Sequence, residues 1–322
     1  MVQNTSHDTI AVLGEAVIDL IVGDDGAYRP HPGGSPYNVA IGLARQGIDV
    51  SFLSPFSDDP FGDRLHDLLL REGVKIPLQR RSRCPTSLSL ITVDDEGKPT
   101  YRIYRQGVAD KDTSFEEIAS SLPDELQAFH TGSLAITPSQ LPRIRKLFDL
   151  MRGRGVVISL DINLRLRACL DTATYLDGVR SLLPLADIVK ASDEDLEPLQ
   201  FAPDARAAAE RAYEAMGTGL LLLTEGKGGA VLYSPQGLIE ARAYRPSQVA
   251  DTIGAGDTFH AAFLARLSQR GALGRAHRDV AQEVLANALD YACAAAAINV
   301  SRPGCNPPNR HEVERFMSAQ RS

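Results

Sequence analysis

Residues 251–258 read Asp-Thr-Ile-Gly-Ala-Gly-Asp-Thr, and the rest of the chain is organised around them. Gly254 and Gly256 allow a tight turn and a close approach of the backbone to a ligand. The residues that follow repeat apolar side chains at helical spacing. A loop that opens into a helix presents unpaired N–H groups at the positive end of the helix dipole, so an anion can bind there. Asp257 would lie beside that anion.

A carboxylate next to a bound phosphate suits one task, which is taking a proton from an attacking hydroxyl. The stretch therefore predicts phosphoryl transfer to an alcohol. The plainer interpretation is ordinary capping, because Asp and Gly are favoured at helix starts. The rest of the chain has to decide between the two.

A second glycine loop lies near the start of the chain. Gly33 and Gly34 precede a helix for which Ser35 is a candidate N-cap, and Pro36 suits the first helical position. Asn38, in the first turn, faces the same loop. Two glycine-rich loops that each open a helix favour a ligand site over capping alone.

Composition bounds the class of protein. The chain has 322 residues, of which 43% are hydrophobic and 23% charged, and its net charge is −7. These values fit a globular protein and argue against a general nucleic-acid or membrane-surface binder. The four cysteines are scattered without a Cys-x-x-Cys pair, and the start of the chain lacks an apolar signal region, so we expect a cytoplasmic protein without a zinc site.

The order of predicted elements indicates an α/β protein. From residue 128 onward, strands alternate with helices, which implies a parallel sheet covered on both faces. The strands are predicted near residues 128–131, 156–161, 188–190, 219–224 and 230–233. Earlier in the chain, residues 87–93 and 100–105 alternate in polarity around the turn 94–98, which predicts a β-hairpin outside the main sheet.

Three familiar motifs are absent from the sequence. It has no Gly-x4-Gly-Lys-Ser/Thr phosphate loop, no Gly-x-Gly-x-x-Gly and no His-Glu-x-x-His. Their absence weakens the interpretations as a P-loop ATPase, a dehydrogenase and a zinc protease.

The two glycine motifs resemble those of the ribokinase (PfkB-type) family of carbohydrate kinases. They are Gly33-Gly34-x-x-x-Asn38 and residues 251–259, and they stand at the separation usual for that family. Further segments resemble the bacterial fructokinase branch: residues 14–19, 161–165, 189–195, 301–304 and 307–308. The resemblance covers nearly the whole chain. It implies a three-layer α/β fold with a mostly parallel central sheet and a small β-sheet lid.

The resemblance also implies roles for the motif residues. Asp257 would be the base that deprotonates the sugar hydroxyl, and the amides of Gly254, Ala255, Gly256 and Asp257 would form an anion hole. Sugar hydroxyls would be held by Asp19, Gly33, Gly34 and Asn38. From the local sequence alone, Asp19 is either a solvated strand residue or a ligand-binding carboxylate.

Nucleotide contacts are carried over in the same way. The implied residues are Lys190, Ser192, Thr224, Gly226, Gly229 and Cys293, the last near the adenine. Arg165 would reach a phosphate or the sugar, or else form a salt bridge with Asp161.

The resemblance implies ATP with Mg²⁺, and in addition a K⁺ site. The family's Asn-x-x-Glu, which organises Mg²⁺, reads Ser192-Asp-Glu-Asp195 here, so either Asp195 or Glu194 would take that role. The K⁺ would be bound by Asp251 and by backbone carbonyls of Ile253, Asn299, Arg302 and Gly304.

Residues 1–322 are expected to form one domain with a lid built from about residues 15–32 and 85–108. Because neighbours on a strand face opposite ways, either Tyr104 or Arg105 would face the sugar. Lids of this family often pair, and the apolar Leu88, Leu90, Ile91 and Val93 favour a homodimer.

The predicted function is an ATP-dependent sugar kinase, a fructokinase, that phosphorylates a hydroxymethyl group. The alternatives are another sugar kinase of the family, in particular a 2-keto-3-deoxygluconate kinase, and a non-catalytic sugar-binding regulator. A sugar acid needs a cation for its carboxylate, and Arg102, Arg105 and Arg165 leave that alternative open. A regulator would be signalled by loss of Asp257 or the glycines, which are all present.

Overall fold

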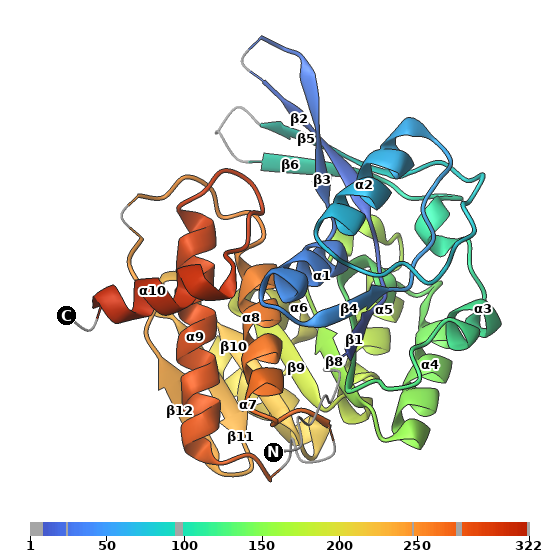
Figure 1. The fold of residues 1–322 in the computed structure, drawn as a ribbon. Helices are drawn as coiled ribbons and strands as arrows, with labels where there is room; N and C mark the ends of the chain where they lie inside the picture. The colour runs from blue at the N-terminus through green and yellow to red at the C-terminus, as the bar shows by residue number, and fades with distance from the viewer. Residues whose placement is uncertain (1–8, 24, 94–98, 247, 275–278, 321–322) are drawn as a thin grey trace, which may run out of the picture.

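The computed structural model describes residues 9–23, 25–93, 99–246, 248–274 and 279–320 (Figure 1). In this part of the chain, the main sheet has eight strands in the order β12-β11-β10-β9-β8-β7-β1-β4. In sequence order they are β1 (Thr9–Val12), β4 (Asp49–Phe52), β7 (Ala128–Gly132), β8 (Val157–Asp161), β9 (Ile188–Ser192), β10 (Leu220–Thr224), β11 (Ala230–Ser234) and β12 (Gly237–Ala241).

The strands from β4 to β10 are parallel, as the alternation of strands and helices predicts. Their side chains are buried on both faces, and Leu220–Leu223 are at most 1% exposed. Such continuous apolar runs are typical of a sheet covered on both sides. The expectation was wrong for β11, which pairs antiparallel with β10 and with β12. Only residues 225–229 join β10 to β11, and a parallel crossover needs a dozen residues or more.

Two helical layers cover the sheet. One contributes to a core cluster with α1 (Ser35–Arg45), α2 (Pro60–Arg71), α8 (Ala255–Gln269), α9 (Gln282–Val300) and α10 (Arg310–Gln320). The other contributes to a second cluster with α3 (Phe115–Ser120), α4 (Leu141–Arg154), α5 (Thr172–Arg180), α6 (Asp193–Leu199) and α7 (Ala205–Met216). Figure 1 shows α1, α8 and α9 on one side of the sheet and α4 and α5 on the other. The fold is therefore a three-layer α/β sandwich.

A separate four-stranded sheet projects from this core (Figure 1). Its order is β3-β2-β5-β6, with β2 (Val17–Val22), β3 (Tyr28–Gly33), β5 (Ser87–Val93) and β6 (Pro99–Tyr104). Strands β2 and β5 are parallel, and each carries an antiparallel neighbour. This confirms the small sheet expected from the sequence. The predicted turn at residues 94–98, the polar start at residues 1–8 and the side chain of Val93 lie outside the described residues.

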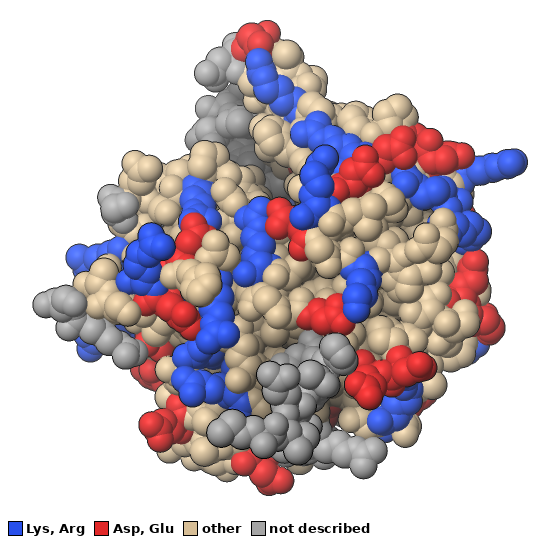
Figure 2. Space-filling view, viewed as in Figure 1, with Lys and Arg blue, Asp and Glu red and all other residues tan. Residues whose placement is uncertain are grey.

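No helix in the described ranges is long and apolar enough to span a membrane. The face of the molecule in Figure 2 carries Lys and Arg interspersed with Asp and Glu. On that face the charges do not form the continuous basic surface that a nucleic-acid binder presents.

Candidate active site

The carboxyl ends of the parallel strands, the start of α1 and the start of α8 meet at one edge of the main sheet. Ligands of open α/β sheets bind outside this edge. The chain enters the small sheet here too, because β2 begins five residues after β1 ends. The two glycine motifs come together at this edge, where Ser35 and Asp257, 222 residues apart in sequence, form a hydrogen bond.

Asp257 lies in the first turn of α8 and is 8% exposed. Its Oδ1 accepts a hydrogen bond of 2.6 Å from the Ser35 hydroxyl, and its Oδ2 accepts one of 2.8 Å from Asn38 Nδ2. Burial raises the pKa of Asp257, while these two donors oppose that rise. The carboxylate is therefore anchored through both oxygens by α1.

Gly254 is the residue before α8 and has a φ of 71°, in the left-handed region that favours glycine. A Cβ there would also lie 2.2 Å from the Cys305 sulfur. Thr258 N–H donates to the Gly254 carbonyl, so the preceding amides have no intrahelical acceptor. Of these, the Ala255 N–H donates to the Thr252 carbonyl at 3.2 Å. The Gly256 and Asp257 amides are the better candidates for an anion hole.

Ser35 is not the N-cap of α1 that the sequence predicted. The residue before α1 is Gly34, with a φ of 110°, and Ser35 is already helical. Its hydroxyl makes no capping bond and goes to Asp257 instead. Sequence reasoning missed this contact, because a serine before a proline in a helix start has the signature of a cap.

Asp19 lies on β2, partly buried. Gly33 gives it room, since a Cβ on Gly33 would lie 2.3 Å from Asp19 Oδ2. Burial raises the pKa of Asp19, and a hydrogen bond from Ser89 and the charges of Arg165 and His31 partly offset it. Asp257 also contributes to raising it, so the two carboxylates act on each other electrostatically across the site.

The alternative that Arg165 pairs with Asp161 was wrong. Asp161 and Lys190 form a buried ion pair instead, with Nζ 2.9 Å from Oδ1, and the two side chains are 0% and 4% exposed. Arg165 is exposed and its charge acts on Asp19. It therefore stays a candidate for contact with the sugar or a phosphate.

Tyr104 and Arg105, the two candidates for a sugar contact from the small sheet, face opposite sides of it because neighbours on a strand alternate. Arg105 follows β6 and is on the same face of the small sheet as Ser87 and Ser89, whereas Tyr104 faces the other way and pairs with Leu88. Tyr104, 59% exposed, therefore lies on the face away from Asp19, which does not favour its predicted sugar contact. Arg105 is on the expected face, but its guanidinium is buried against Asp110 and Ser87. Its guanidinium is thus engaged in an internal ion pair, and its contact with the sugar stays a prediction.

Lys190 lies under the first turn of α8. A Cβ on Gly256 would be 3.3 Å from its Nζ. The ammonium group is thus held by Asp161 at the place where the helix would receive an anion.

A chain of buried polar side chains was not predicted from the sequence. His130 contacts Ser159 at 3.0 Å, and Ser159 contacts His260 at 2.8 Å. Burial lowers the pKa of both histidines, which favours their neutral forms.

The other predicted nucleotide residues surround the ends of β9 and β10. Thr224 ends β10, and Gly226 and Gly229 bound a tight turn after it, with φ of 53° and 102°. Ser192 ends β9, caps the start of α6 and exchanges hydrogen bonds with Asp195. Cys293 is 5% exposed inside the apolar core, and burial raises the pKa of its thiol to about 12. Cys293 therefore packs in the core, and its contact near the adenine stays a prediction.

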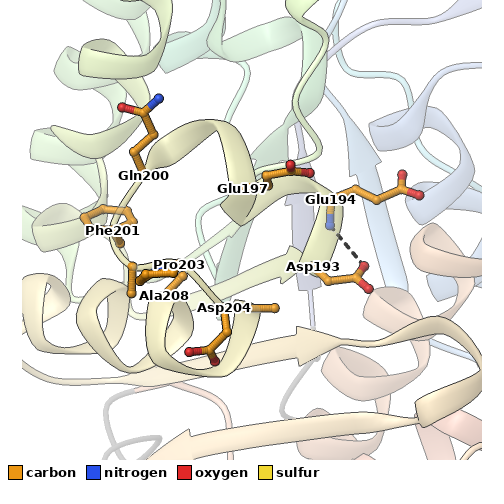
Figure 3. Close-up of a pocket in the computed structure, with 10 residues that line it drawn as sticks. Asp193, Glu194, Glu197, Gln200, Phe201, Pro203, Asp204 and Ala208 are labelled. Atoms are coloured by element: carbon orange, nitrogen blue, oxygen red, sulfur yellow. Dashed lines mark hydrogen bonds between the residues drawn. The ribbon is translucent and has the colours of Figure 1, made fainter.

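Asp195 serves a structural purpose in this chain. Its Oδ2 accepts from the Ser192 amide at 2.8 Å, and its Oδ1 accepts from the Leu164 amide at 2.6 Å. Glu194 lines a cavity of about 750 Å³ beside α6 and α7, together with Asp193, Glu197 and Asp204 (Figure 3). The cavity is lined by α6, α7 and the segment that joins them. Because its charged lining is acidic, it is a poor place for phosphate groups.

The residues expected to bind K⁺ lie in two adjacent segments. Asp251 accepts from the Ile253 amide at 2.9 Å and from the Gly304 amide at 3.0 Å. Asn299 Nδ2 donates to the Ile253 carbonyl at 2.9 Å, and the Arg302 amide donates to the Asn299 carbonyl. Among the described residues, no group of three or more His, Cys, Asp or Glu side chains is placed to hold a metal. A cation here would depend on carbonyl oxygens, which the two segments supply.

Together, the fold and this site define a class: an α/β protein that anchors a buried carboxylate at a helix start, beside a small projecting sheet. The chain matches the model of the pfkB family carbohydrate kinases over residues 7–312, and it belongs to that family. It is therefore a carbohydrate kinase.

Known members of this group agree in sequence and structure. The fructokinase of Klebsiella pneumoniae is 33% identical over 265 residues, which cover 81% of this chain and 85% of that protein. The structure of the Xylella fastidiosa fructokinase with bound ATP is 27% identical and covers 98% of this chain and 100% of its own, with a TM-score of 0.89. The structure of the Vibrio cholerae O395 fructokinase, bound to fructose, ADP and a calcium ion, is 26% identical. The match covers 97% of this chain and 99% of that one, with a TM-score of 0.83. The chain is a fructokinase-like member of the family.

Proposed function

We propose that this protein is a fructokinase that transfers the γ-phosphoryl group of ATP to a hydroxymethyl oxygen of fructose. The observation that carries the proposal is the placement of Asp257, buried at the start of α8 and anchored by Ser35 and Asn38. Asp19 lies across from it on the small sheet. The fructose and ATP seen in related fructokinases supply the substrate pair.

The reaction follows from this placement. The proton of the sugar hydroxymethyl moves to a carboxylate oxygen of Asp257. The sugar oxygen then forms a bond to the γ-phosphorus, while the bond from that phosphorus to the bridging oxygen breaks and ADP leaves. The Gly256 and Asp257 amides and the Lys190 ammonium group face the phosphoryl group and stabilise its charge.

Metal ions take supporting parts in this proposal. Mg²⁺ carried on the ATP phosphates neutralises part of their charge, and Glu194 or Asp195 would orient its water shell. K⁺ would bind carbonyl oxygens of residues 253, 299, 302 and 304, steadied by Asp251. The small sheet would act as the lid over the sugar, and the protein would work in the cytoplasm as a homodimer.

A neutral sugar suits the site better than a sugar acid. Arg105 is neutralised by Asp110, and Arg102 is on the face of the small sheet away from Asp19. Arg165 is left beside Asp19, whose negative charge would oppose a substrate carboxylate. These placements disfavour 2-keto-3-deoxygluconate.

The test is ADP release with Mg-ATP and a panel of fructose, glucose, ribose, 2-keto-3-deoxygluconate and adenosine, with and without K⁺. We expect turnover concentrated on fructose and faster with K⁺. Turnover on the sugar acid would overturn the choice of substrate, and silence on every sugar would favour a non-catalytic regulator.

The base is tested by Asp257→Asn. The amide cannot take the proton, so kcat should fall by about a thousandfold or more, while calorimetry should show fructose binding within a few fold of the wild type. Asp290→Asn, on α9, is the matched control and should retain full activity. A near-normal kcat for Asp257→Asn would show that another group is the base.

A further inference from the structure

Ser35 makes the shortest polar contact to the carboxylate at the centre of the site. Its Oγ lies 2.6 Å from Asp257 Oδ1, and its side chain is 6% exposed. Asn38 holds the other oxygen at 2.8 Å. The plane of the carboxylate is therefore set by two donors on one turn of α1.

The backbone of Ser35 is itself held in place. Its N–H donates to Glu15 Oε1 at 3.3 Å, and Pro36 restricts the conformation just before it. Gly34 approaches the Glu15 carbonyl so closely that a Cβ would lie 2.5 Å from the oxygen. The Ser35 hydroxyl is thus presented to Asp257 by a rigid turn, and not by a mobile surface side chain.

The two donors differ chemically. An amide NH₂ only donates, whereas a hydroxyl donates and accepts. When Asp257 is ionised, both groups donate to it. When Asp257 has taken a proton, the Ser35 hydroxyl can rotate and accept a hydrogen bond from the new carboxyl O–H. Ser35 therefore suits both protonation states of the base, which a purely structural contact does not require.

We propose that Ser35 is a positioning residue for Asp257, which orients the carboxylate toward the sugar hydroxyl and favours its ionised form. This inference rests on the proposed role of Asp257 as the base. When Asp257 is ionised, its Oδ1 accepts a hydrogen bond from the Ser35 hydroxyl. The sugar hydroxyl then approaches the remaining lone pairs of the carboxylate. A hydroxyl lost from this position leaves the carboxylate less fixed and less readily ionised.

The experiment compares Ser35→Ala with Ser35→Thr, which keeps a hydroxyl, in the full-length protein. For Ser35→Ala we expect kcat to fall by about ten- to a hundredfold, with KM for fructose within threefold of the wild type. The acid limb of the kcat/KM pH profile should move to higher pH by about one unit, because a donor that favours the charged form has been removed. Ser35→Thr should recover most of both effects.

Ser268→Ala is the matched control, since Ser268 is also buried, lies on α8 and bonds to a side chain, that of Gln127. It should change neither kcat nor the pH profile. If Ser35→Ala does not give folded protein, Ser35→Cys keeps the side-chain size with a weaker donor and should show a smaller shift in the same direction.

The outcomes separate the two proposals. We take about twofold in kcat and about 0.2 pH units in the profile as the experimental error. If both values for Ser35→Ala lie within these limits of the wild type, the proposed role of Ser35 is wrong. A lower thermal stability with an unmoved pH profile would also overturn it, because that is the mark of a packing contact alone. Activity of Asp257→Asn would instead remove the proposed function on which this inference rests.

Discussion

At the scale of single residues, Glu15 is the most unusual ionisable group near the site. It is 1% exposed, and its Oε2 has no hydrogen-bond partner among the residues that the structure describes. Burial raises its pKa to about 7, against the smaller opposing effect of the Arg105 charge. Stability associated with the protonated form is full below the unfolded pKa near 4.5 and is lost as pH rises through about 7.

We therefore expect Glu15→Gln to change the pH dependence of stability. We take the difference in unfolding free energy between variant and wild type near pH 4 as the baseline. By pH 8 this difference should shift by about 3 kcal/mol in favour of the variant. Urea unfolding at several pH values measures this difference. Glu240→Gln, on the exposed part of β12, is the control, and parallel curves for Glu15→Gln and wild type would contradict the prediction.

At the scale of elements, adjacent strands are tied at their carboxyl ends by charge. Asp161 ends β8 and Lys190 lies on β9, and both are buried. Burial alone would raise the pKa of Asp161, but Lys190 and His260 hold it well below its ordinary value of 3.8. The pair thus contributes stability above pH 3.8 that is lost as pH falls through the lower folded pKa.

Breaking this pair should be costly, because it leaves one charge buried without a partner. We expect Asp161→Asn or Lys190→Met to lower the free energy of unfolding by about 3–5 kcal/mol each, and the double variant to lose much less than the sum. Denaturant unfolding at pH 7 measures all three. Lys75→Met, which removes an exposed ion pair with Asp49, should cost under about 1 kcal/mol. Additive effects at residues 161 and 190 would contradict the coupling.

At the scale of the whole molecule, the face of the small sheet away from Asp19 combines apolar side chains with Arg102, and its Leu20 and Leu88 pack in part against the main core. Leu20 and Leu90 pair across β2 and β5, and Leu88 pairs with Tyr104. The exposed Tyr28, paired with Val22, lies on the same face. The opposite face carries Asp19 and Ser89, so the sheet can cover the sugar on one side and meet a second copy on the other. This arrangement supports the proposed homodimer.

The dimer prediction is checked by sedimentation. The wild type should sediment at twice the monomer mass of 34.8 kDa, and Tyr104→Asp should shift it toward the monomer. A charge placed in an apolar interface is expensive to bury, which is the reason for the shift. Leu238→Asp changes an exposed leucine on β12, in the other sheet, and should leave the mass unchanged. A monomeric wild type at micromolar concentration would refute the dimer.

The α/β class, the strands of the parallel sheet, the small sheet and the two glycine loops could all be predicted from the sequence. These depend on local periodicity and on turn chemistry, which short windows of sequence express. Asp257, the start of α8 and the family were predictable for the same reason.

Which side chains contact one another became clear from the folded structure alone. Ser35 donates a hydrogen bond to Asp257, 222 residues away in sequence. Asp161 forms its ion pair with Lys190 and not with Arg165, and Arg105 forms an ion pair with Asp110. The folded structure also decided that Tyr104 faces away from the site and that Cys293 is core. The physical reason is that the contacts and the burial of a side chain depend on how segments distant in sequence pack together. Local sequence patterns carry no information on that packing.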